Sequence, residues 1–467
     1  MATISSAGIG SGLDVNSIVT QLMAIERQPL TALQTKQTAI QTTVSEYGKI
    51  KSAVSTLNDV AAKLAGSLAW LQTVATASGT AVSASTNNSA PGTYSVEVQA
   101  LASVQTIAMG TAVPATTTPG AGTLHIELGT WGAGQTSFTP KAGATAVDVS
   151  IAATDTLADV RDKINAAGAG VTALVMTDAS GSRLLIRSNA SGAANAFRTS
   201  GVASLAFDPS AGVTTMVQSQ TASDAAATVN GLAVTSSTNS LTNIVDGLTL
   251  NLAAVTTDPV TVNVATDTEA LKKTITDFAA AYTAVVQLIA TDTKYDAATR
   301  KGGILQGDSA AVGLQRQLRT LAGSVSGASA AFAHLSDAGL ELQADGSMTV
   351  NASKLGNALG NLDELRKMFA NSDLTDPTKD GFAKRFRVAT DNMLGIDGAL
   401  TTRTDGLGQQ LQRNQKDQDA LNVRLDAIEK RLRDQYTALD TVMAQLNTQS
   451  AYLTQQIAQF NANLSSK

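Results

Sequence analysis

The stretch LNVRLDAIEKRLRDQYTALDTVMAQLNTQSAYL, residues 421–453, decides the fold, because an apolar residue or Gln recurs along it in alternating steps of four and three. This period is typical of a coiled coil, in which a helix buries one apolar edge against another helix. Nothing in the backbone stops this helix, since residues 409–467 contain neither Gly nor Pro. The recurring positions are Leu421, Leu425, Ile428, Leu432, Gln435, Leu439, Val442, Leu446, Gln449 and Leu453, and Ile457, Phe460 and Leu464 continue them after a stutter.

The second half of this helix is polar but uncharged. Beyond Asp440 no charged residue occurs until Lys467, whereas a helix on the surface of a monomer usually carries charges on its outer face. Amides beside an apolar stripe suit burial among other protein helices, because they avoid the desolvation cost of ions. We therefore expect this helix to take part in assembly. The alternative is an intramolecular bundle in which Gln435 and Gln449 face water at its edge.

A second helical region is predicted over residues 13–75, with Asp14 placed to cap its first turn. Pro29 lacks the N–H that a helix interior needs, so we expect a kink there, with Gln28 outside helical geometry and a hinge near Arg27. Two interleaved heptad series follow and predict a second coiled-coil edge. They are Leu33, Ile40, Tyr47, Val54, Ala61 and Leu68, and Ile50, Leu57, Leu64 and Leu71.

The middle of the chain, residues 76–265, has only 17 charged residues and is rich in Ala, Ser, Thr and Gly. Alternating runs such as TYSVEVQAL, GTLHIELG, DVSIA, SRLLIRS and GLTLNLAAV predict strands with one buried face. One helix is predicted at Thr156–Gly168, where apolar residues recur at helical spacing before a terminal Gly. We interpret this region as two small β-rich domains, one inserted in the other.

Helix returns from Thr268 onward, and a hairpin around Asp345-Gly346 is predicted in LELQADGSMTV, residues 340–350. The first helix of this region has a stripe at helical spacing that should be buried. The stripe consists of Leu271, Ile275, Phe278, Tyr282, Val285 and Ile289.

An amphipathic helix cannot bury its apolar stripe alone, so the two ends of the chain should pack together. The predicted fold class is multidomain α+β, with an antiparallel coiled-coil or bundle leg formed by both termini and two β-rich head domains inserted between them. The predicted domains are a leg of residues 1–40 and 430–467, a helical bundle of 41–75 and 266–429, one head of 76–105 and 205–265, and a second head of 106–204.

Composition excludes several classes of protein. The net charge is −5 and the longest basic cluster is KRFR, residues 384–387, which we interpret as the wet face of a helix, so no nucleic-acid partner is expected. No cysteine is present, which excludes disulfides and thiolate chemistry. The N-terminus lacks the pattern of a cleavable signal peptide, and no apolar run approaches a membrane span, so no membrane insertion is expected.

The sequence offers no catalytic constellation. His125 and His334 are the only histidines, and neither has a carboxylate or second His at ligand spacing. The glycines of GIGSG, residues 8–12, are not preceded by a strand as a dinucleotide loop requires. TDTKYDAATRKGG, residues 291–303, lacks the ligand pattern of a calcium loop and is interpreted as a turn. We expect no enzyme, no catalytic residue, no cofactor and no metal.

Several motifs together resemble one protein family. They are GIGSGLDVNSIVTQLMAIERQPL at the start, GTYSVEVQALA, VNGLAVTS followed by IVDGLTLNL, GILQGDSA, and RLRDQYTALDTVMAQLNTQSAYL at the end. In this order they resemble the bacterial flagellar filament cap family, also called hook-associated protein 2, over nearly the whole chain. TLADVRDKINAAGAGVTALV also looks like a repeat shared by such caps and flagellins.

The resemblance implies a ring-shaped homo-oligomer at the filament tip that helps exported flagellin to fold and insert and prevents its loss, as motility requires. It also implies an extracellular location at the flagellum, export without a cleaved signal peptide, flagellin as a partner, and a cytoplasmic export chaperone on the C-terminal helix. As a hypothesis, a C-terminal set pairs with Ile18, Leu22 and Ile25, and both together contact flagellin or a neighbouring subunit. The C-terminal set is Leu432, Leu439, Val442, Leu446, Leu453, Ile457 and Phe460.

Three alternatives stay open. Another axial flagellar protein would share helical termini around a β-rich middle, and it should form long filaments when pure. A surface adhesin would bind host glycans or mucin through residues 76–265 alone, where Trp131 and Phe138 are the outstanding aromatic residues. A coiled-coil scaffold would require the match of several motifs to be accidental.

Overall fold

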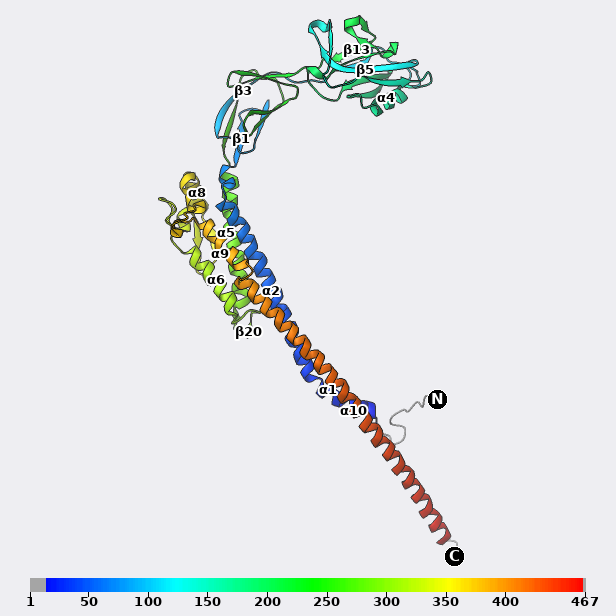
Figure 1. The fold of residues 1–467 in the computed structure, drawn as a ribbon, viewed down its shortest axis with the longest axis vertical. Helices are drawn as coiled ribbons and strands as arrows, with labels where there is room; N and C mark the ends of the chain where they lie inside the picture. Colours follow the sequence, from blue (N-terminus) through cyan, green and yellow to red (C-terminus); the bar gives the residue numbers. More distant parts are fainter. Residues whose placement is uncertain (1–13, 465–467) are drawn as a thin grey trace. The chain divides into compact units, whose positions relative to one another are not determined.

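The computed structural model describes residues 14–464 of the 467-residue chain. It divides into two compact units, one made of the chain as far as Ala69 together with everything from Leu271, and the other of Trp70–Ala270. The first unit is helical and the second is built mainly from strands, so the expected α+β class is confirmed (Figure 1).

The helical unit contains the two long helices from the ends of the chain and a group of shorter ones between them. The long helices are α2 (Gln28–Ala65) and α10 (Ala399–Leu464). The others are α1 (Val15–Glu26), α5 (Thr268–Thr293), α6 (Ser309–Ala322), α7 (Ala352–Leu359), α8 (Leu362–Ala370) and α9 (Phe382–Leu394), with α3 (Leu68–Leu71) following α2. Two short hairpins, β19 (Tyr295–Asp296) with β20 (Lys301–Gly302) and β21 (Leu340–Leu342) with β22 (Met348–Val350), complete it; the second is the predicted hairpin.

The N-terminal helical region is broken next to Pro29, as predicted. α1 ends at Glu26 and α2 begins at Gln28, so the break lies at Arg27; the expectation that Gln28 would leave helical geometry was wrong. Proline is tolerated in the first turn of a helix, where its missing N–H would have no partner in any case. Pro29 therefore starts α2 rather than kinking a continuous helix.

The helix also ends earlier than predicted. Gly66 adopts an extended conformation with ψ 153°, which stops α2 at Ala65. Strand β1 then begins at Thr73, so residues 73–75 are strand rather than helix. Leu68 and Leu71 accordingly fall outside the heptad series, whereas the series within α2 is buried at Ile40, Tyr47, Ile50, Val54, Leu57, Ala61 and Leu64.

Helix α5 belongs to the core of the bundle. Its whole predicted stripe is buried, and Phe278 and Tyr282 meet Phe386 of α9 edge to face at ring distances of 5.1 Å and 5.9 Å. Within residues 14–464, α5 is also the one helix whose length and apolar composition would suit a membrane span, which the sequence reading overlooked. Because protein already covers its apolar face, we interpret α5 as a core helix.

The basic cluster KRFR was predicted to be the solvated face of a helix, but α9 packs part of it into the bundle. Phe386 is fully buried, and Arg385 donates from Nη1 to the carbonyl oxygen of Val325 at 3.0 Å. Burial lowers the pKa of Arg385 from its usual value. Half of the cluster is thus part of the bundle rather than a solvated face.

A buried polar contact joins α2, α6 and α10. The carboxylate of Asp308 accepts a hydrogen bond from Tyr47 Oη at 2.7 Å and two from Arg403, from Nε at 3.0 Å and Nη2 at 2.7 Å. Asp308 also caps α6 by accepting from the backbone N–H groups of Ala310 and Ala311. One carboxylate therefore fixes the start of α6 against both long helices. We call these three side chains, Tyr47, Asp308 and Arg403, the Asp308 clamp.

α10 begins at Ala399, ten residues before the predicted start at Gln409, and passes through Gly406 and Gly408. A glycine inside a helix costs about 1 kcal/mol relative to alanine. Leu400 and Leu407 are buried where α10 packs on α2 and α9, and burial of a leucine contributes about 1.5–3 kcal/mol. Packing therefore outweighs the two glycines, which the sequence alone had suggested as the limit of the helix.

The β-rich unit contains two domains whose strands pair antiparallel. The first domain has two sheets. One has the strand order β1 (Thr73–Ala77), β18 (Val260–Thr266), β3 (Gly92–Ala100), β14 (Ala225–Val229) and β15 (Leu232–Ser236). The other has the order β16 (Ser240–Val245), β17 (Leu248–Leu252) and β2 (Val82–Thr86). Neighbours β3 and β14 are separated along the chain by all the strands of the second domain, which is therefore an insertion. The two sheets share one core, which includes Val82, Val96, Val98, Leu241, Leu250 and Val262.

The second domain has two sheets and one helix. One sheet has the order β12 (Val213–Thr214), β11 (Phe207–Asp208), β10 (Ala196–Ser200), β5 (Gly122–Trp131) and β6 (Phe138–Pro140), with β7 (Val147–Ile151) also paired to β5. The other has the order β13 (Met216–Gln220), β4 (Thr106–Met109), β9 (Gly181–Ser188) and β8 (Val171–Asp178). Residues 205–220, which we had expected in the first domain, pair with these strands, because Phe207 and Met216 point into this core.

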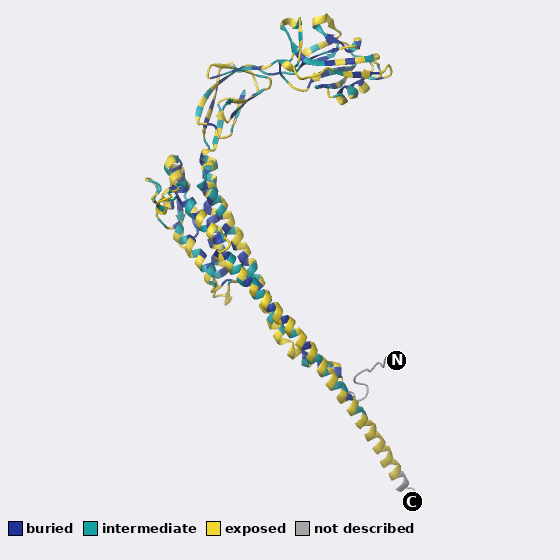
Figure 2. Ribbon diagram, viewed as in Figure 1, coloured by how far each residue is buried: buried dark blue, intermediate teal, exposed yellow. Residues whose placement is uncertain are grey.

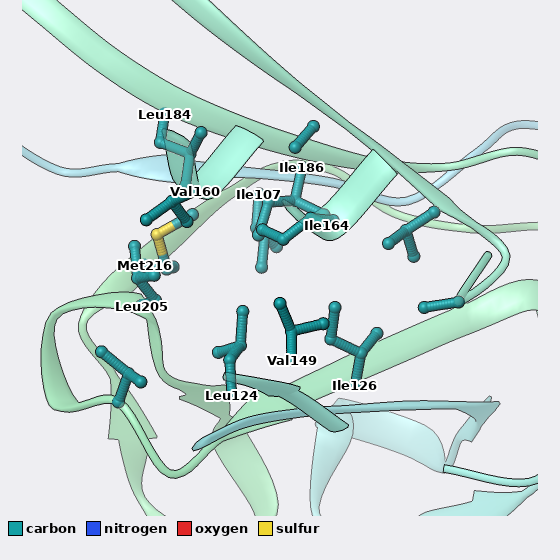
Figure 3. Packing of buried hydrophobic residues seen from close by; sticks show 14 of the residues in the cluster. Ile107, Leu124, Ile126, Val149, Val160, Ile164, Leu184, Ile186, Leu205 and Met216 are labelled. Carbon is teal, nitrogen blue, oxygen red and sulfur yellow. The ribbon is translucent and has the colours of Figure 1, made fainter. Parts of the chain in front are cut away.

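Helix α4 (Leu157–Ala166) lies within the predicted range Thr156–Gly168 and covers the second domain's core. Thr156 caps it, with Asp159 completing a capping box. Its apolar face, Leu157, Val160 and Ile164, is buried. Figure 3 shows Val160 and Ile164 packed among Ile107, Leu184, Ile186 and Met216 of one sheet and Leu124, Ile126 and Val149 of the other.

Candidate interaction surface

Helix α1, near the start of the chain, lies beside α10, the last helix (Figure 1). Val15, Val19 and Met23 of α1 are buried together with Leu425 of α10. These three residues of α1 are spaced by four and lie on one helix face. Further apolar residues are partly buried against this cluster: Leu30, Leu421, Ile428, Leu432 and Tyr436. The antiparallel pairing of the termini is therefore present within a single chain.

The predicted pairing of α1 with α10 chose the wrong residues of α1, whereas their contact with other subunits remains a prediction. We had expected Ile18, Leu22 and Ile25 to meet α10, but Ile18 and Leu22 are only half-buried and Ile25 is 63% exposed. The stripe of Val15, Val19 and Met23 lies next to theirs on the helix, and both stripes are apolar. The spacing by four from Val15 to Met23 was visible in the sequence, yet it gave no reason to prefer one stripe over the other.

Ion pairs flank this apolar contact. Arg27 Nη2 lies 3.2 Å from Glu429 Oε2, and Arg433 Nη2 lies 2.9 Å from Glu429 Oε1. Arg433 also donates to Asn16 Oδ1 at 3.0 Å. The hydrogen bond from Arg433 lowers the pKa of Glu429 below its usual value. The charges of α10 are thus used to fix the register of α1.

Closer to the bundle, amides join α2 to α10. Gln37 donates to Gln415 Oε1 at 3.2 Å and accepts from Gln418 Nε2 at 3.0 Å. Gln418, which is buried, also donates to Asn414 Oδ1 at 2.6 Å. Side-chain amides in α10 can therefore be buried without ions and with hydrogen bonds to one another, although Asn414 Nδ2 is buried without a partner.

The part of α10 that extends past the N-terminal end of α1 has its predicted apolar positions exposed to solvent. We call this set the C-terminal stripe; it consists of Leu439, Val442, Leu446, Leu453, Ile457 and Phe460, whose exposed fractions run from 46% to 66%. Heptad spacing places it on the same helix face as Leu425, which is 3% exposed. Figure 2 shows the change from buried and intermediate residues to an exposed segment toward the end of α10. Of the seven C-terminal residues predicted for the interface, only Leu432 is half-buried against α1.

The C-terminal stripe offers a partner apolar surface without charge. No charged residue occurs between Asp440 and Lys467, so neither ion pairs nor repulsion would set its partner. Complete burial of an aliphatic or aromatic side chain contributes about 1.5–3 kcal/mol, and roughly half of that remains available at each of these positions. Gln435 and Gln449 are exposed as well, and amides of this kind are buried with partners elsewhere in α10.

Residues considered for chemistry do not converge on a site. His125 does face a carboxylate, since its Nδ1 lies 2.5 Å from Oδ1 of Asp148 across the β5–β7 pair, but both side chains are exposed. His334 Nδ1 lies 3.6 Å from Oδ2 of Asp337, so the expectation that neither histidine has a carboxylate nearby was wrong for both. Among residues 14–464, no group of three or more His, Cys, Asp or Glu side chains is arranged to hold a metal ion. The glycines at 8–12 fall outside the described residues.

Comparison with known proteins assigns the chain by sequence. The model for the flagellar hook-associated protein 2 N-terminus matches residues 11–105, and the model for its C-terminus matches residues 222–448. Between them, the flagellin hook IN motif matches residues 133–190, inside the second β-rich domain. The two outer matches end and begin close to the points where the second domain is inserted in the first.

Whole-chain relatives agree with these models. Flagellar hook-associated protein 2 of Escherichia coli K12 is 32% identical to this chain over 488 residues, and the match covers 100% of both chains. A-type flagellar hook-associated protein 2 of Pseudomonas aeruginosa is 28% identical, and the match covers 97% of this chain and 96% of the relative. The crystal structure of the D1-D2-D3 domains of the flagellar cap protein FliD from Escherichia coli matches with a TM-score of 0.57 at 29% identity, covering 78% of this chain and 99% of that chain. The chain therefore belongs to the flagellar hook-associated protein 2 family.

Proposed function

We propose that the chain is a structural cap at the distal end of the bacterial flagellar filament, where a homo-oligomeric ring promotes insertion of exported flagellin and prevents its loss. The observation that carries this proposal is the C-terminal stripe, which continues the face that packs on α1 and is half or more exposed at most of its positions. Family membership supplies the setting. A chain of this family with an exposed apolar leg has a surface for other axial subunits.

Two partners fit the leg at different stages. At the filament tip, the C-terminal stripe and the half-exposed stripe of α1, Ile18, Leu22 and Ile25, contact flagellin or the neighbouring cap subunit. Before export, the same exposed face of α10 suits a cytoplasmic chaperone, because a helix with one apolar stripe is bound by covering that stripe. The working location is extracellular, on the flagellum, and export proceeds without a cleaved signal peptide. The role is structural rather than enzymatic.

A pair of substitutions tests the leg. Ile457 lies in the C-terminal stripe and is 60% exposed, whereas Gln455 is exposed on the opposite side of the same turn. We expect Ile457→Lys to stop filament growth in cells that lack the natural cap protein, because a lysine cannot be buried there without loss of its hydration. Gln455→Lys adds the same charge to the same helix and should leave filament growth unchanged.

Filament length by electron microscopy and swimming in soft agar are the measurements. Circular dichroism of both purified variants checks that the helix is retained. Full motility with Ile457→Lys would contradict the proposed leg contact. Removal of residues 446–467 should likewise leave the β-rich domains folded and the ring able to form while filament growth is lost.

The adhesin alternative has no support among the described residues. Trp131 meets Phe138 edge to face at 4.6 Å and donates from Nε1 to Gln105 Oε1 at 2.9 Å. Both rings are half-buried, and Arg198 lies over Phe138 at 4.9 Å. These aromatic residues stabilise the second β-rich domain and do not form an open platform for a ligand.

A further inference from the structure

The sheet β13-β4-β9-β8 of the second β-rich domain has one face in the core and one face turned away from it. Side chains alternate between the two faces of a strand. In β9, Leu184 and Ile186 are buried in the core shared with α4, so Arg183, Leu185 and Arg187 belong to the other face. We call this the outer sheet face.

An apolar row crosses all four strands of the outer sheet face. Strand register places Val217 opposite Ala108, Ala108 opposite Leu185, and Leu185 opposite Leu174. Val217 is 53% exposed and Leu174 is 43% exposed, and Met176 beside Leu174 is 61% exposed. A cross-strand row of this kind on an isolated sheet is normally covered by another layer.

The charges of the outer sheet face are two arginines, neither of them in an ion pair, and the carboxylate of Asp178, whose pKa is lowered by hydrogen bonds from Ser180 and, less strongly, by the charge of Arg183, so positive charge is in excess. Arg183 and Arg187 flank Leu185 on β9, and neither makes an ion pair or side-chain hydrogen bond among the described residues; Arg183 Nε is moreover shielded from solvent without a partner. Asp178, at the tip of the β8–β9 hairpin, is the carboxylate of this face, and it accepts from the N–H of Ser180 at 2.7 Å.

The other cations of the same domain have partners. Arg161 pairs with Asp162, Lys163 with Asp155, and Arg198 with both Glu127 and Asp208. Lys141 donates to Asn195. Arg183 and Arg187 therefore stand apart from a domain that otherwise balances its charges locally.

The first β-rich domain has the opposite character. Its residues 73–105 and 221–266 contain the carboxylates Glu97, Asp224, Asp246 and Asp258 and not a single Lys or Arg. Glu97 lies on β3 opposite Thr228, on the face turned away from the core residues Val96 and Val98. Its neighbours on that face are Ser95, Thr93, Thr261 and Asn263, so Glu97 is the charge of an otherwise neutral, polar surface.

We propose that the outer sheet face of one subunit docks on the Glu97 face of a second copy of the chain. The occupant is a second copy because this chain supplies both halves. One half is an apolar row with two arginines against a single carboxylate, Asp178, and the other is a surface whose one charge is the acidic Glu97. The contact joins unlike surfaces, so each subunit uses one face toward each neighbour, which generates a ring when the rotation closes. The inference rests on the proposed function, whose ring it provides with a specific contact.

Charge reversal in the full-length protein tests the contact. Arg183→Glu faces Glu97 with a like charge, and we expect the concentration at which half of the protein is assembled to rise by about tenfold or more, because unlike charge pairs at interfaces couple strongly. Glu97→Arg alone should do the same. The double variant, Arg183→Glu with Glu97→Arg, restores opposite charges across the contact and should recover most of the lost assembly.

Arg161→Glu is the matched control, since Arg161 belongs to the same domain but lies on α4, on the other side of the sheet. Analytical ultracentrifugation over a concentration series measures assembly, and thermal unfolding checks the fold of each variant. Assembly of Arg183→Glu and Glu97→Arg at the wild-type concentration, or failure of the double variant to recover, would overturn this contact while leaving the cap function intact. A wild-type protein that stays monomeric at every concentration would instead refute the ring itself.

Discussion

The Asp308 clamp offers a sharp test of what holds the helical unit together. The Asp308 side chain is only 7% exposed, while Arg403 is 35% exposed and can still reach water. In Asp308→Ala, α6 loses its cap, which costs about 1 kcal/mol, and the Tyr47 hydroxyl loses its acceptor, which costs about 1–3 kcal/mol. Because Arg403 can be rehydrated, we add little for the broken ion pair. The free energy of unfolding should therefore fall by about 3 kcal/mol.

Urea unfolding of the full chain, followed by far-UV circular dichroism, measures this change, since the helical signal comes mainly from the unit that contains the clamp. Asp308→Asn keeps an oxygen for the cap but loses the charge, so it should cost about half as much. Asp296→Asn is the control, because Asp296 also accepts from backbone N–H groups but lies in an exposed hairpin. A loss below about 0.5 kcal/mol in Asp308→Ala would refute the clamp.

The clamp also sets a dependence on pH. Burial alone would raise the pKa of Asp308, but the hydrogen bonds from Tyr47 and Arg403 outweigh it and hold the pKa below its usual value. A carboxylate with a lowered pKa in the folded state adds stability above the unfolded pKa of about 3.9, and that stability is lost as pH falls. The wild type should thus lose more stability than Asp308→Asn between pH 5 and the acid limit, which the same urea titrations measure.

Two further predictions concern single residues of the helical unit. Asp292 is buried, its Oδ2 has no hydrogen-bond partner, and burial together with the nearby Glu46 charge raises its pKa. Asp292→Asn should therefore stabilise the protein by about 1 kcal/mol at neutral pH. This advantage should shrink as pH falls and the wild-type carboxyl becomes protonated, which urea midpoints at several pH values would measure. Gly408 is helical with open space where a Cβ would lie. Gly408→Ala should therefore raise the free energy of unfolding by about 0.5–1 kcal/mol. A lower free energy of unfolding in urea would show that the neighbours of Gly408 are packed more tightly than the structure indicates.

Local patterns predicted most of the elements correctly because each pattern has a direct physical cause. Heptad spacing located the buried residues of α2, helical spacing located the stripe of α5, and alternation located strands such as β3 and β9. The break at Arg27 followed from the missing N–H of Pro29. These are consequences of geometry within one element, which a sequence contains in full.

Errors arose where tertiary packing chose between locally equivalent options. Two adjacent apolar stripes run along α1, and only contact with Leu425 decides that Val15, Val19 and Met23 are the buried ones. The glycines at 406 and 408 favour an end to the helix, and only the burial of Leu400 and Leu407 reverses that preference. The clamp unites residues 261 and 95 positions apart, and Asp308 within GILQGDSA gave no local sign of its partners.

The same contrast explains why the apolar pattern of α10 predicted its buried and its exposed halves alike. The heptad series is unbroken from Leu421 to Leu453, yet Leu425 is covered by α1 and Leu453 is 58% exposed. Periodicity states that a helix has an apolar edge; it does not state which polypeptide covers that edge. What distinguishes the two halves is charge, because Glu429 and Arg433 hold α1 in register where the chain covers itself. Between Asp440 and Lys467 the sequence offers no charge that would commit the edge to one register, and this suits the proposed contact of the leg with other subunits.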